Sequence, residues 1–265
     1  MNVDKFLLYS IESFPPLRES IDKLNKLYNA SEVDTKAIER VVESDPILYT
    51  DILHYANSPH YGFRHPLSRI SQVITLFGQT TLRGMAIIAA LKAHPFTDLR
   101  AYGITIEEWF GVMEKQQHFL ELWLGKNHRE LLDPLGGLPF ILEIGRLIAA
   151  YALMFTNNPY RFTKISPEEL LLEEKNIIGS SGDELACTLF ELWFFDATLV
   201  DSLRHSFNPA SAIEPKACAA LKCARTLFTL GSTEPFETIV SILEEYSLDA
   251  NDALSAYQTI TGKST

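Results

Sequence analysis

The stretch DPILYTDILHYANSPHYG, residues 45–62, decides the fold of this chain. Its first two residues predict a helix start, because Asp45 can accept hydrogen bonds as the N-cap and Pro46 is tolerated in a first turn. We expect this helix to end near Asn57, since the side chains of Asn57 and Ser58 can bond to nearby backbone groups. The stretch therefore predicts a helix whose exit is held by local polar contacts.

The residues that follow predict a turn and a second helix. Pro59 cannot continue a helix, and Gly62 permits a backbone conformation that other residues avoid. Gly78 stands where a C-terminal cap is expected. Between these points, apolar side chains recur at helical spacing at Ile70, Val73, Ile74 and Phe77. We therefore predict a helix over 68–77.

Helical spacing of apolar residues continues along almost the whole chain, and no convincing strand pattern occurs. Helix starts are marked by capping sequences, such as Thr105 with Glu108 and Ser166 with Glu169. The sequence thus predicts an all-α fold. We expect helices near 16–29, 34–44, 46–57, 68–77, 79–93, 105–124, 139–155, 167–177, 182–195, 197–206, 215–230, 235–246 and 250–261.

The order of these helices predicts two lobes and an extension. The first five helices make an N-terminal lobe at about 10–100, and the break at His94-Pro95 separates it from a second helical lobe at about 105–210. We expect residues 211–265 to form a C-terminal helical extension that packs on the second lobe. The connecting segments are short and rich in turn residues, unlike disordered linkers.

The pattern over residues 45–78 resembles the hallmark of the HDOD family, which reads DPxLxxxLLxxANSxxYG and then ISxxxxAIxxLG. Upstream, residues 14–17 (FPPL) resemble the family's opening LPPLP. The resemblance extends more weakly to about residue 210, and it implies an HDOD-type domain over 10–210 with an HD-like second lobe. The signature residues that carry it are Asp45, Pro46, Asn57, Ser58, Tyr61, Gly62 and Gly78.

This resemblance implies a bacterial signal-transduction domain that is related to the HD metal-dependent phosphohydrolases but lacks their activity. HD-type hydrolysis needs a metal ion held by histidines, an adjacent His-Asp pair and a later aspartate. No His-Asp dipeptide occurs in the sequence. The segment that resembles the family's LLHDIG reads ILEIGR at 141–146, so Leu142 takes the histidine position and Glu143 the aspartate position.

The other metal positions of the HD family are also altered under this alignment. If Trp109 matches the family tryptophan, the first histidine falls near Gly111 or Val112, and the late aspartate falls near Arg225. Leucine cannot ligate a metal, and a cation at Arg225 opposes metal binding. We therefore expect no catalytic residue, no metal and no cofactor, and we predict that the chain is not an enzyme.

Three histidines around the hallmark suggest an alternative zinc site. His54, His60 and His65 lie six and five residues apart, which does not repeat a helical face, and structural zinc sites usually have tighter ligand spacing. We interpret them as a helical residue and two turn residues. His205 stands near a predicted helix end, where a favourable contact with the helix dipole explains it better than catalysis.

Paired glutamates suggest acid-base chemistry, but neighbours on a helix point about 100° apart. We therefore interpret the pairs as solvated faces and caps, including Glu173-Glu174. Ser180-Ser181-Gly182 lacks the strand and glycine pattern of a nucleophile elbow, and it predicts a helix N-cap instead. A different kind of site is suggested by Phe194-Phe195, because an exposed aromatic pair would anchor a protein partner.

Composition narrows the classes of partner. The 34 acidic and 23 basic side chains give a formal charge of −11, which repels nucleic acid where no basic patch exists. Apolar runs such as 147–155 are too short to span a membrane, which takes about 20 residues. The N-terminus lacks a signal-peptide pattern, and these features together predict a cytoplasmic protein.

The sequence leaves three functions open. The first is a non-catalytic regulatory module that acts through contact with an unidentified signalling protein. The second is a degenerate HD-type phosphohydrolase that acts on a nucleotide signal. The third is a sensor that binds a small ligand in the cleft between the lobes, where the ancestral active site is expected.

Overall fold

The computed structural model of the chain describes residues 19–28, 30, 32–92, 98–155, 160–163, 166–193 and 195–262. Several predicted features lie outside these residues: the FPPL motif at 14–17, the break at His94-Pro95 and the first ring of the aromatic pair, Phe194. The side chain of His60 also lies outside the description. The fold consists of the elements that the described residues form.

The described part of the chain is almost entirely helical, as predicted, with one two-stranded hairpin. The short 3-10 helices are η1 (Pro59–Tyr61), η2 (Arg100–Tyr102), η3 (Leu138–Phe140), η4 (Pro209–Ser211) and η5 (Phe236–Ile239). The α-helices are α2 (Glu19–Tyr28), α3 (Thr35–Glu43), α4 (Pro46–Ala56), α5 (Ile70–Phe77), α6 (Gln79–Lys92), α7 (Ile106–Leu124), α8 (Arg129–Leu132), α9 (Ile144–Phe155), α10 (Pro167–Ile178), α11 (Gly182–Leu192), α12 (Ala197–Arg204), α13 (Pro215–Leu227), α14 (Val240–Glu245) and α15 (Ala250–Thr261).

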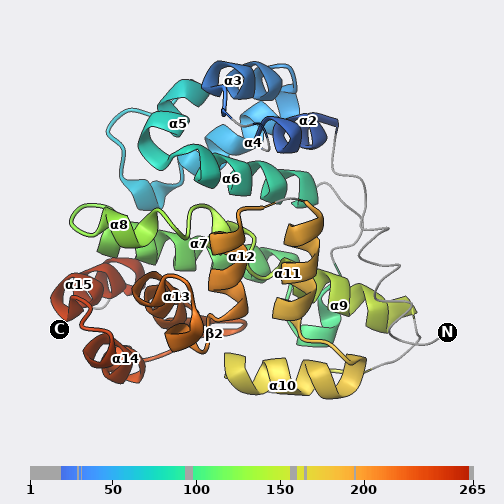
Figure 1. Cartoon of the computed structure of the whole chain (residues 1–265), viewed down its shortest axis with the longest axis vertical. Helices are drawn as coiled ribbons and strands as arrows, with labels where there is room; N and C mark the ends of the chain where they lie inside the picture. The colour runs from blue at the N-terminus through green and yellow to red at the C-terminus, as the bar shows by residue number, and fades with distance from the viewer. Residues whose placement is uncertain are drawn as a thin grey trace.

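Helices α2 to α6 form the N-terminal lobe, which is the upper layer of Figure 1. Helix α6 is the apolar centre of this lobe, and every residue over 81–91 is buried. A helix that is apolar on all sides must be covered on all sides. Helices α2, α4 and α5 pack against it from one side, and the second lobe covers the other.

Helix α7 is the long spine of the second lobe. Helices α13 and α15 pack on α7, and α9 packs against α11 and α10 (Figure 1). The buried apolar residues of both lobes belong to one continuous core. The exact limits of the predicted lobes and of the 211–265 extension stay a prediction.

The two lobes meet through close backbone contact and through one buried arginine. A Cβ atom on Gly84 of α6 would lie 2.6 Å from the carbonyl oxygen of Gly137, so glycine is needed where these backbones touch. Arg83 donates to the side chain of Asn25 at 2.8 Å and to the carbonyl oxygen of Trp193 at 2.9 Å. Arg83 therefore ties α2 and α6 to the turn after α11.

The helices predicted over 215–230 and 139–155 end or begin at other residues than expected. The helix predicted over 215–230 stops at Leu227, because the backbone of 228–229 is extended and pairs with 232–233. Gly231, with φ 99°, lies in the turn of this hairpin. The helix predicted over 139–155 begins at Ile144, because residues 138–143 form a 3-10 turn and a further turn first.

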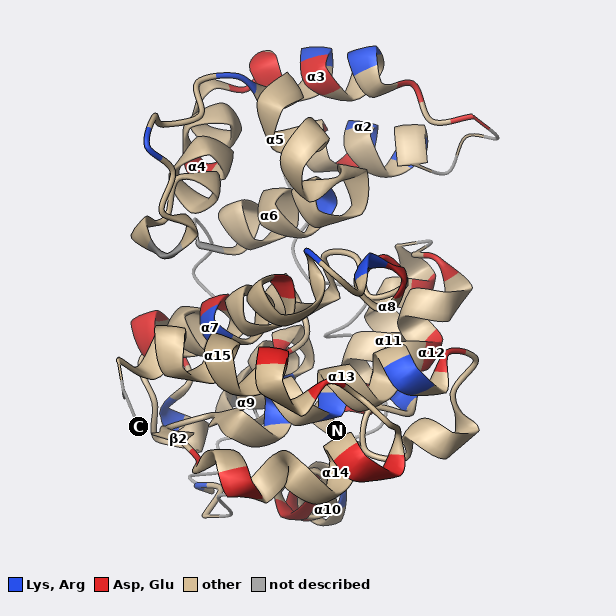
Figure 2. Cartoon of the chain, turned by 90° about the vertical axis from the view of Figure 1, so that its left-hand side faces the viewer, with Lys and Arg blue, Asp and Glu red and all other residues tan. Residues whose placement is uncertain are grey.

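Charged side chains are spread over both lobes. In the view of Figure 2, Lys and Arg alternate with acidic residues, and they do not gather into one broad basic face. None of the helices that the structure describes combines the length and the apolarity needed to cross a lipid bilayer.

Candidate functional site

The hallmark segment fixes the exit of α4 through the side chain of Asn57. Its amide nitrogen donates to the carbonyl oxygens of Leu53 and Leu67, each at 2.8 Å, and its amide oxygen accepts from the backbone amide of Leu67 at 2.6 Å. These bonds close the loop over 58–67, because an asparagine amide both donates and accepts. At the start of α4, Asp45 accepts from two first-turn amides, as its predicted N-cap role requires.

The closed loop carries an aromatic wall that faces the second lobe. Gly62, with φ 60°, turns the chain after η1 and sets Tyr61 and Phe63 side by side at a ring distance of 5.9 Å. Phe77, at the end of α5, packs edge-on against Tyr61 at 4.8 Å and against Phe63 at 6.2 Å. We call Tyr61, Phe63 and Phe77 the aromatic wall.

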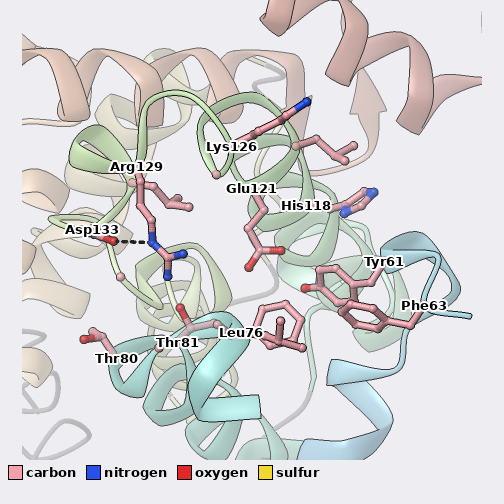
Figure 3. Close-up of a pocket in the computed structure, with 16 residues that line it drawn as sticks. Tyr61, Phe63, Leu76, Thr80, Thr81, His118, Glu121, Lys126, Arg129 and Asp133 are labelled. Atoms are coloured by element: carbon pink, nitrogen blue, oxygen red, sulfur yellow. Dashed lines mark ion pairs between the residues drawn. The ribbon is translucent and has the colours of Figure 1, made fainter. Parts of the chain in front are cut away.

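The aromatic wall forms one side of a pocket between the lobes, which we call the interlobe pocket. Its volume is about 720 Å³, within the range of small-molecule sites. The N-terminal lobe also contributes Leu76, Gly78, Thr80 and Thr81. Figure 3 shows the opposite side, which α7, α8 and the segments beside them supply as His118, Glu121, Leu122, Gly125, Lys126, Arg129, Leu132, Asp133 and Gly136.

Glu121 is the central acid of the interlobe pocket. One of its carboxylate oxygens accepts from Gln117 Nε2 at 2.7 Å, and the carboxylate points into the cavity (Figure 3). Burial raises the pKa of Glu121 to about 7, against the smaller lowering effect of hydrogen bonds from Gln117 and Tyr61. Its pKa therefore lies near neutral pH, far above that of a solvated glutamate.

Arg129 brings a positive charge to the same pocket. Its guanidinium extends into the cavity, and its Nε lies 3.5 Å from a carboxylate oxygen of Asp133 (Figure 3). Both members of this pair are more than half exposed, so their mutual attraction is weak. No ion pair in the described residues includes Glu121. The pocket thus holds an acid and a guanidinium that do not form an ion pair with each other.

A second polar centre lies inside the second lobe and is closed to solvent. We call it the buried cluster, and its members are between 0% and 6% exposed. They come from the turn before α9, from α9 itself, and from α10, α11 and α13. The members are Glu143, Arg146, Glu174, Asp183 and Arg225.

Arg225 and Asp183 form the strongest pair of the buried cluster. Two guanidinium nitrogens of Arg225 donate to the two carboxylate oxygens of Asp183, at 2.6 and 2.8 Å, and Arg225 also donates to the Ser206 hydroxyl at 2.5 Å. Burial would raise the pKa of Asp183, but Arg225, together with Arg146 and the Ser206 hydroxyl, outweighs it and holds that pKa below its usual range. The pair is therefore charged and bidentate.

Arg146 links the remaining acids of the buried cluster. Its Nη1 contacts a carboxylate oxygen of Glu143, and its Nε lies 3.0 Å from Glu174. Glu174 also accepts from the Tyr102 hydroxyl at 2.9 Å and from the Gly182 amide at 2.6 Å. Burial, opposed by Arg146, raises the pKa of Glu174. The interpretation of Glu174 as a solvated glutamate is wrong, because α10 turns this side chain into the core.

Two positions that the HD resemblance singled out meet in the buried cluster. Glu143 lies 3.7 Å from Arg225, although 82 residues separate them in the sequence. Leu142 is an apolar core residue with 1% exposure, and Trp109 donates to the carbonyl oxygen of Glu143 at 3.3 Å. Neither Leu142 nor Glu143 lines the interlobe pocket. The two residues at the expected His-Asp position therefore lie outside the interlobe pocket.

Gln116 is a residue of this region that the sequence did not reveal. It lies one turn of α7 beyond Val112, and it lines a remaining space of about 10 Å³ beside Glu143 and Arg225. Its Nε2 donates to the carbonyl oxygen of Phe228 at 2.8 Å. The sequence signal that could have found Gln116 is its place one helical turn after Val112, near which the alignment puts the first histidine of the family.

The alternative sites find little support. His54 and His65 are exposed, and neither belongs to a cluster of possible metal ligands in the described residues. His205 closes α12 and lies 2.9 Å from Asp201. The prediction that Phe195 is an exposed anchor is wrong, because the residue is 9% exposed and the Arg83 guanidinium lies over its ring at 3.7 Å.

One group of possible metal ligands does occur in the described residues, outside both centres. His128, Asp249 and Asp252 place one ligand atom each within 4.8 Å of one another, where the segment before α8 meets α15. Asp249 caps α15 and Asp252 accepts from Asn127, so both acids have structural roles there.

Comparison with known proteins shows which domain family the N-terminal region matches. The sequence pattern of the HDOD domain matches residues 14–107. The chain contains an HDOD domain. The match includes the hallmark segment with Asn57 and the aromatic wall, so the HDOD domain supplies one side of the interlobe pocket. No curated protein matches the chain.

Solved structures share the fold over nearly the whole HDOD-containing chain. A virulence factor from Campylobacter jejuni is 26% identical, with 99% of each chain covered and a TM-score of 0.59. A protein named "Putative phosphohydrolase" from Shewanella amazonensis is 20% identical, with 96% of each chain covered and a TM-score of 0.64. An HDOD domain protein from Geobacter sulfurreducens is 15% identical over 99% of this chain and 91% of that one, with a TM-score of 0.54.

Proposed function

We propose that this chain is a non-catalytic regulatory module of bacterial, cytoplasmic signal transduction, which passes a change of state to a protein partner. The observation that carries the proposal is the buried cluster. Its acids are paired with two guanidinium groups, and two of its members, Glu143 and Arg225, stand at positions where the HD resemblance expects metal ligands. The positive charge of a metal ion is thus replaced by the charges of Arg146 and Arg225.

The donor set of the buried cluster does not suit a catalytic metal. Divalent ions in HD-type sites take histidine and carboxylate ligands, and the histidine position holds the buried side chain of Leu142. Glu143, Glu174 and Asp183 do not form a group of converging ligand atoms in the described part of the chain. A metal would also lie beside Arg225, whose charge repels it. These points support a lost metal centre.

The size of the remaining space supports the same proposal. About 10 Å³ remains beside Glu143, Arg146 and Arg225, which is roughly the room that one water molecule needs. A phosphate ester and its attacking water do not fit there. Hydrolysis at this position would require the ion pairs to separate and the core to open.

A second candidate function is metal-dependent phosphohydrolysis of a nucleotide signal. It is favoured by the name of the similar protein from Shewanella amazonensis and by the group of His128, Asp249 and Asp252. That group lies away from the buried cluster, and its acids already cap a helix and accept a hydrogen bond. In the described part of the chain, the second candidate therefore lacks a site that combines metal ligands with an enclosed substrate pocket.

Metal analysis combined with a phosphodiesterase assay separates the two functions. Purified protein is equilibrated with Mn²⁺, dialysed, and measured for bound metal and for hydrolysis of bis(p-nitrophenyl) phosphate and cyclic dinucleotides. We expect no retained metal and no turnover above the buffer. A control variant, D249N/D252N, removes ligands from the exposed group. Stoichiometric metal with turnover in the wild type would overturn the proposal, and the variant would show whether the metal lies at the His128, Asp249 and Asp252 group.

The partner half of the proposal needs a separate measurement in cells. Cross-linking of the native protein, followed by identification of the linked peptides, should recover a signalling protein bound to a defined helical surface. Recovery of nucleic acid instead, or of no protein beyond random contacts, would contradict this half. The metal result would be unaffected by that outcome.

A further inference from the structure

The interlobe pocket has a feature that the proposed function does not use. Glu121 and Arg129 face one cavity from the second lobe, and each lacks a strong partner of opposite charge there. Glu121 bonds to the neutral amide of Gln117, and the contact of Arg129 with Asp133 is long and exposed. A desolvated acid without a cation is costly, so a bound group that supplies the missing charge would be stabilising.

The two charges come from the same lobe but point toward different ends of the cavity. The Glu121 carboxylate points toward the aromatic wall, close to the Tyr61 hydroxyl, whereas the Arg129 guanidinium lies toward Thr81 (Figure 3). An occupant that reaches from the aromatic wall toward Thr81 would therefore meet an acceptor near the wall and a donor at the far end. The hydroxyl groups of Thr80 and Thr81 line the second end as well.

The aromatic wall gives one side of the pocket an apolar surface. Tyr61 and Phe63 stack on each other, and the pocket continues over Leu76. Planar or aliphatic groups bind well to such surfaces, because they bury apolar area and match the flat faces of the rings. The pocket thus presents the aromatic wall at one side, the acid beside it and the Arg129 guanidinium at the other side.

We propose that the interlobe pocket binds a small dipolar molecule, with N–H donors for Glu121, an apolar body for the aromatic wall and an anionic group for Arg129. An amino acid with a large apolar side chain has this chemistry, and so does a guanine nucleotide. Guanine offers neighbouring N–H groups to a carboxylate, and its phosphate suits an arginine. The inference goes beyond the proposed function and does not depend on it.

Binding at this position would join the lobes. The aromatic wall belongs to η1, its following loop and α5, whereas Glu121 and Arg129 belong to α7 and α8. A ligand that contacts both sides stabilises the arrangement in which the lobes are held together, by an amount set by its concentration and affinity. Such a ligand would be an input for a regulatory module.

The test uses the full chain and two probes, L-tryptophan and guanosine 5′-monophosphate, in isothermal titration calorimetry. Matched analogues lack one group each: tryptamine and guanosine lack the anion, and indole-3-propionate lacks the ammonium. We expect at least one complete probe to bind with one site per chain, and its analogues to bind about tenfold more weakly. The probe that binds identifies the source of the shared chemistry.

Variants localise the binding and separate it from the overall fold. We expect Arg129→Ala and Glu121→Gln each to weaken binding of the active probe by about tenfold, while thermal unfolding stays cooperative. Arg40→Ala is the matched control, because Arg40 is an exposed arginine with a similarly long ion pair on α3, away from the pocket. The inference is overturned when neither probe binds, or when binding is equal in the two pocket variants and the control.

The outcome of this test is distinct from that of the metal experiment. Binding without turnover supports both the pocket inference and the proposed function. Binding followed by chemical conversion of the probe would keep the pocket and overturn the non-catalytic module. Absence of binding overturns the pocket alone.

Discussion

In the buried cluster every guanidinium lies within ion-pair distance of a carboxylate, whereas around the interlobe pocket Glu121 and Arg129 share a cavity without pairing. The first region leaves about 10 Å³ of space and the second about 720 Å³. Charges that are fully paired in the core hold a structure, and charges that remain apart around an open cavity can bind something else. The comparison therefore separates a structural centre from a binding centre.

The largest effect is expected where the paired centre is broken. Arg225→Ala removes both hydrogen bonds to Asp183 and leaves that carboxylate buried, so we expect the free energy of unfolding to fall by about 3–5 kcal/mol. Chemical denaturation measures the change. Arg204→Ala is the control, because the Arg204–Glu191 pair is exposed and should contribute no more than about 1 kcal/mol. Equal losses in the two variants would remove the distinction.

The pH dependence of stability tests the interlobe pocket through its acid, Glu121. Glu121 has a pKa of about 7 in the folded chain and a lower value when unfolded, so the folded state binds the extra proton between about pH 4.5 and 7. Its contribution is therefore present at low pH and is lost as the pH rises through 7. We expect this contribution to fall by no more than about 3 kcal/mol over that window, and Glu121→Gln to abolish it.

The measurement for this prediction is the pH dependence of unfolding in the wild type minus that in the Glu121→Gln variant. The difference cancels titration elsewhere, including that of Glu174. Interactions of Glu121 with the groups that face it in the pocket remain in the difference. These groups are Tyr61, His118, Lys126, Arg129 and Asp133. A difference that is flat, or that rises with pH, would contradict a desolvated and unpaired acid.

The wall of the pocket depends on a polar clamp in the HDOD domain. Asn57→Ala removes three hydrogen bonds and leaves the backbone of Leu67 without its partner, so we expect a loss of about 1–3 kcal/mol in the free energy of unfolding. Compared with the wild type, hydrogen exchange in the variant should be accelerated more over 58–69 than elsewhere. Uniform exchange along the chain would show that the clamp does not act locally.

The smallest effect on stability is expected for the arginine of the pocket. Arg129→Ala removes an exposed pair at 3.5 Å from Asp133, so the free energy of unfolding should change by less than about 0.5 kcal/mol. Chemical denaturation of this variant and of Arg225→Ala under the same conditions compares the contributions of the two arginines to stability. A loss of several kcal/mol at Arg129 would show that this charge holds the fold.

The features that the sequence predicted are local ones. The N-cap at Asp45 and the polar exit at Asn57 depend on residues within one or two turns, so the pattern alone located them. Helix periodicity located nearly every helix for the same reason. The end of α13 was missed because the pairing of 228–229 with 232–233 competes with a weak helical continuation.

The features that the sequence could not predict depend on distant contacts. Glu174 has the pattern of a solvated acid on α10, and only the approach of Tyr102 and Arg146 reveals that it is buried. Gly145 permits that approach, because a Cβ atom there would clash with the backbone of Gly182. The interlobe pocket exists only where the two lobes meet, so no local motif marks Glu121.

The central claim is that paired guanidinium groups stand where a metal would lie in an HD-type site. The most direct test is a crystal grown with Mn²⁺ and measured for anomalous scattering. We expect no anomalous peak at Glu143 and Asp183, with Arg225 still bonded to both oxygens of Asp183 as in the present structure. A peak at about 2–2.5 Å from these carboxylates, with Arg225 displaced, would contradict the account.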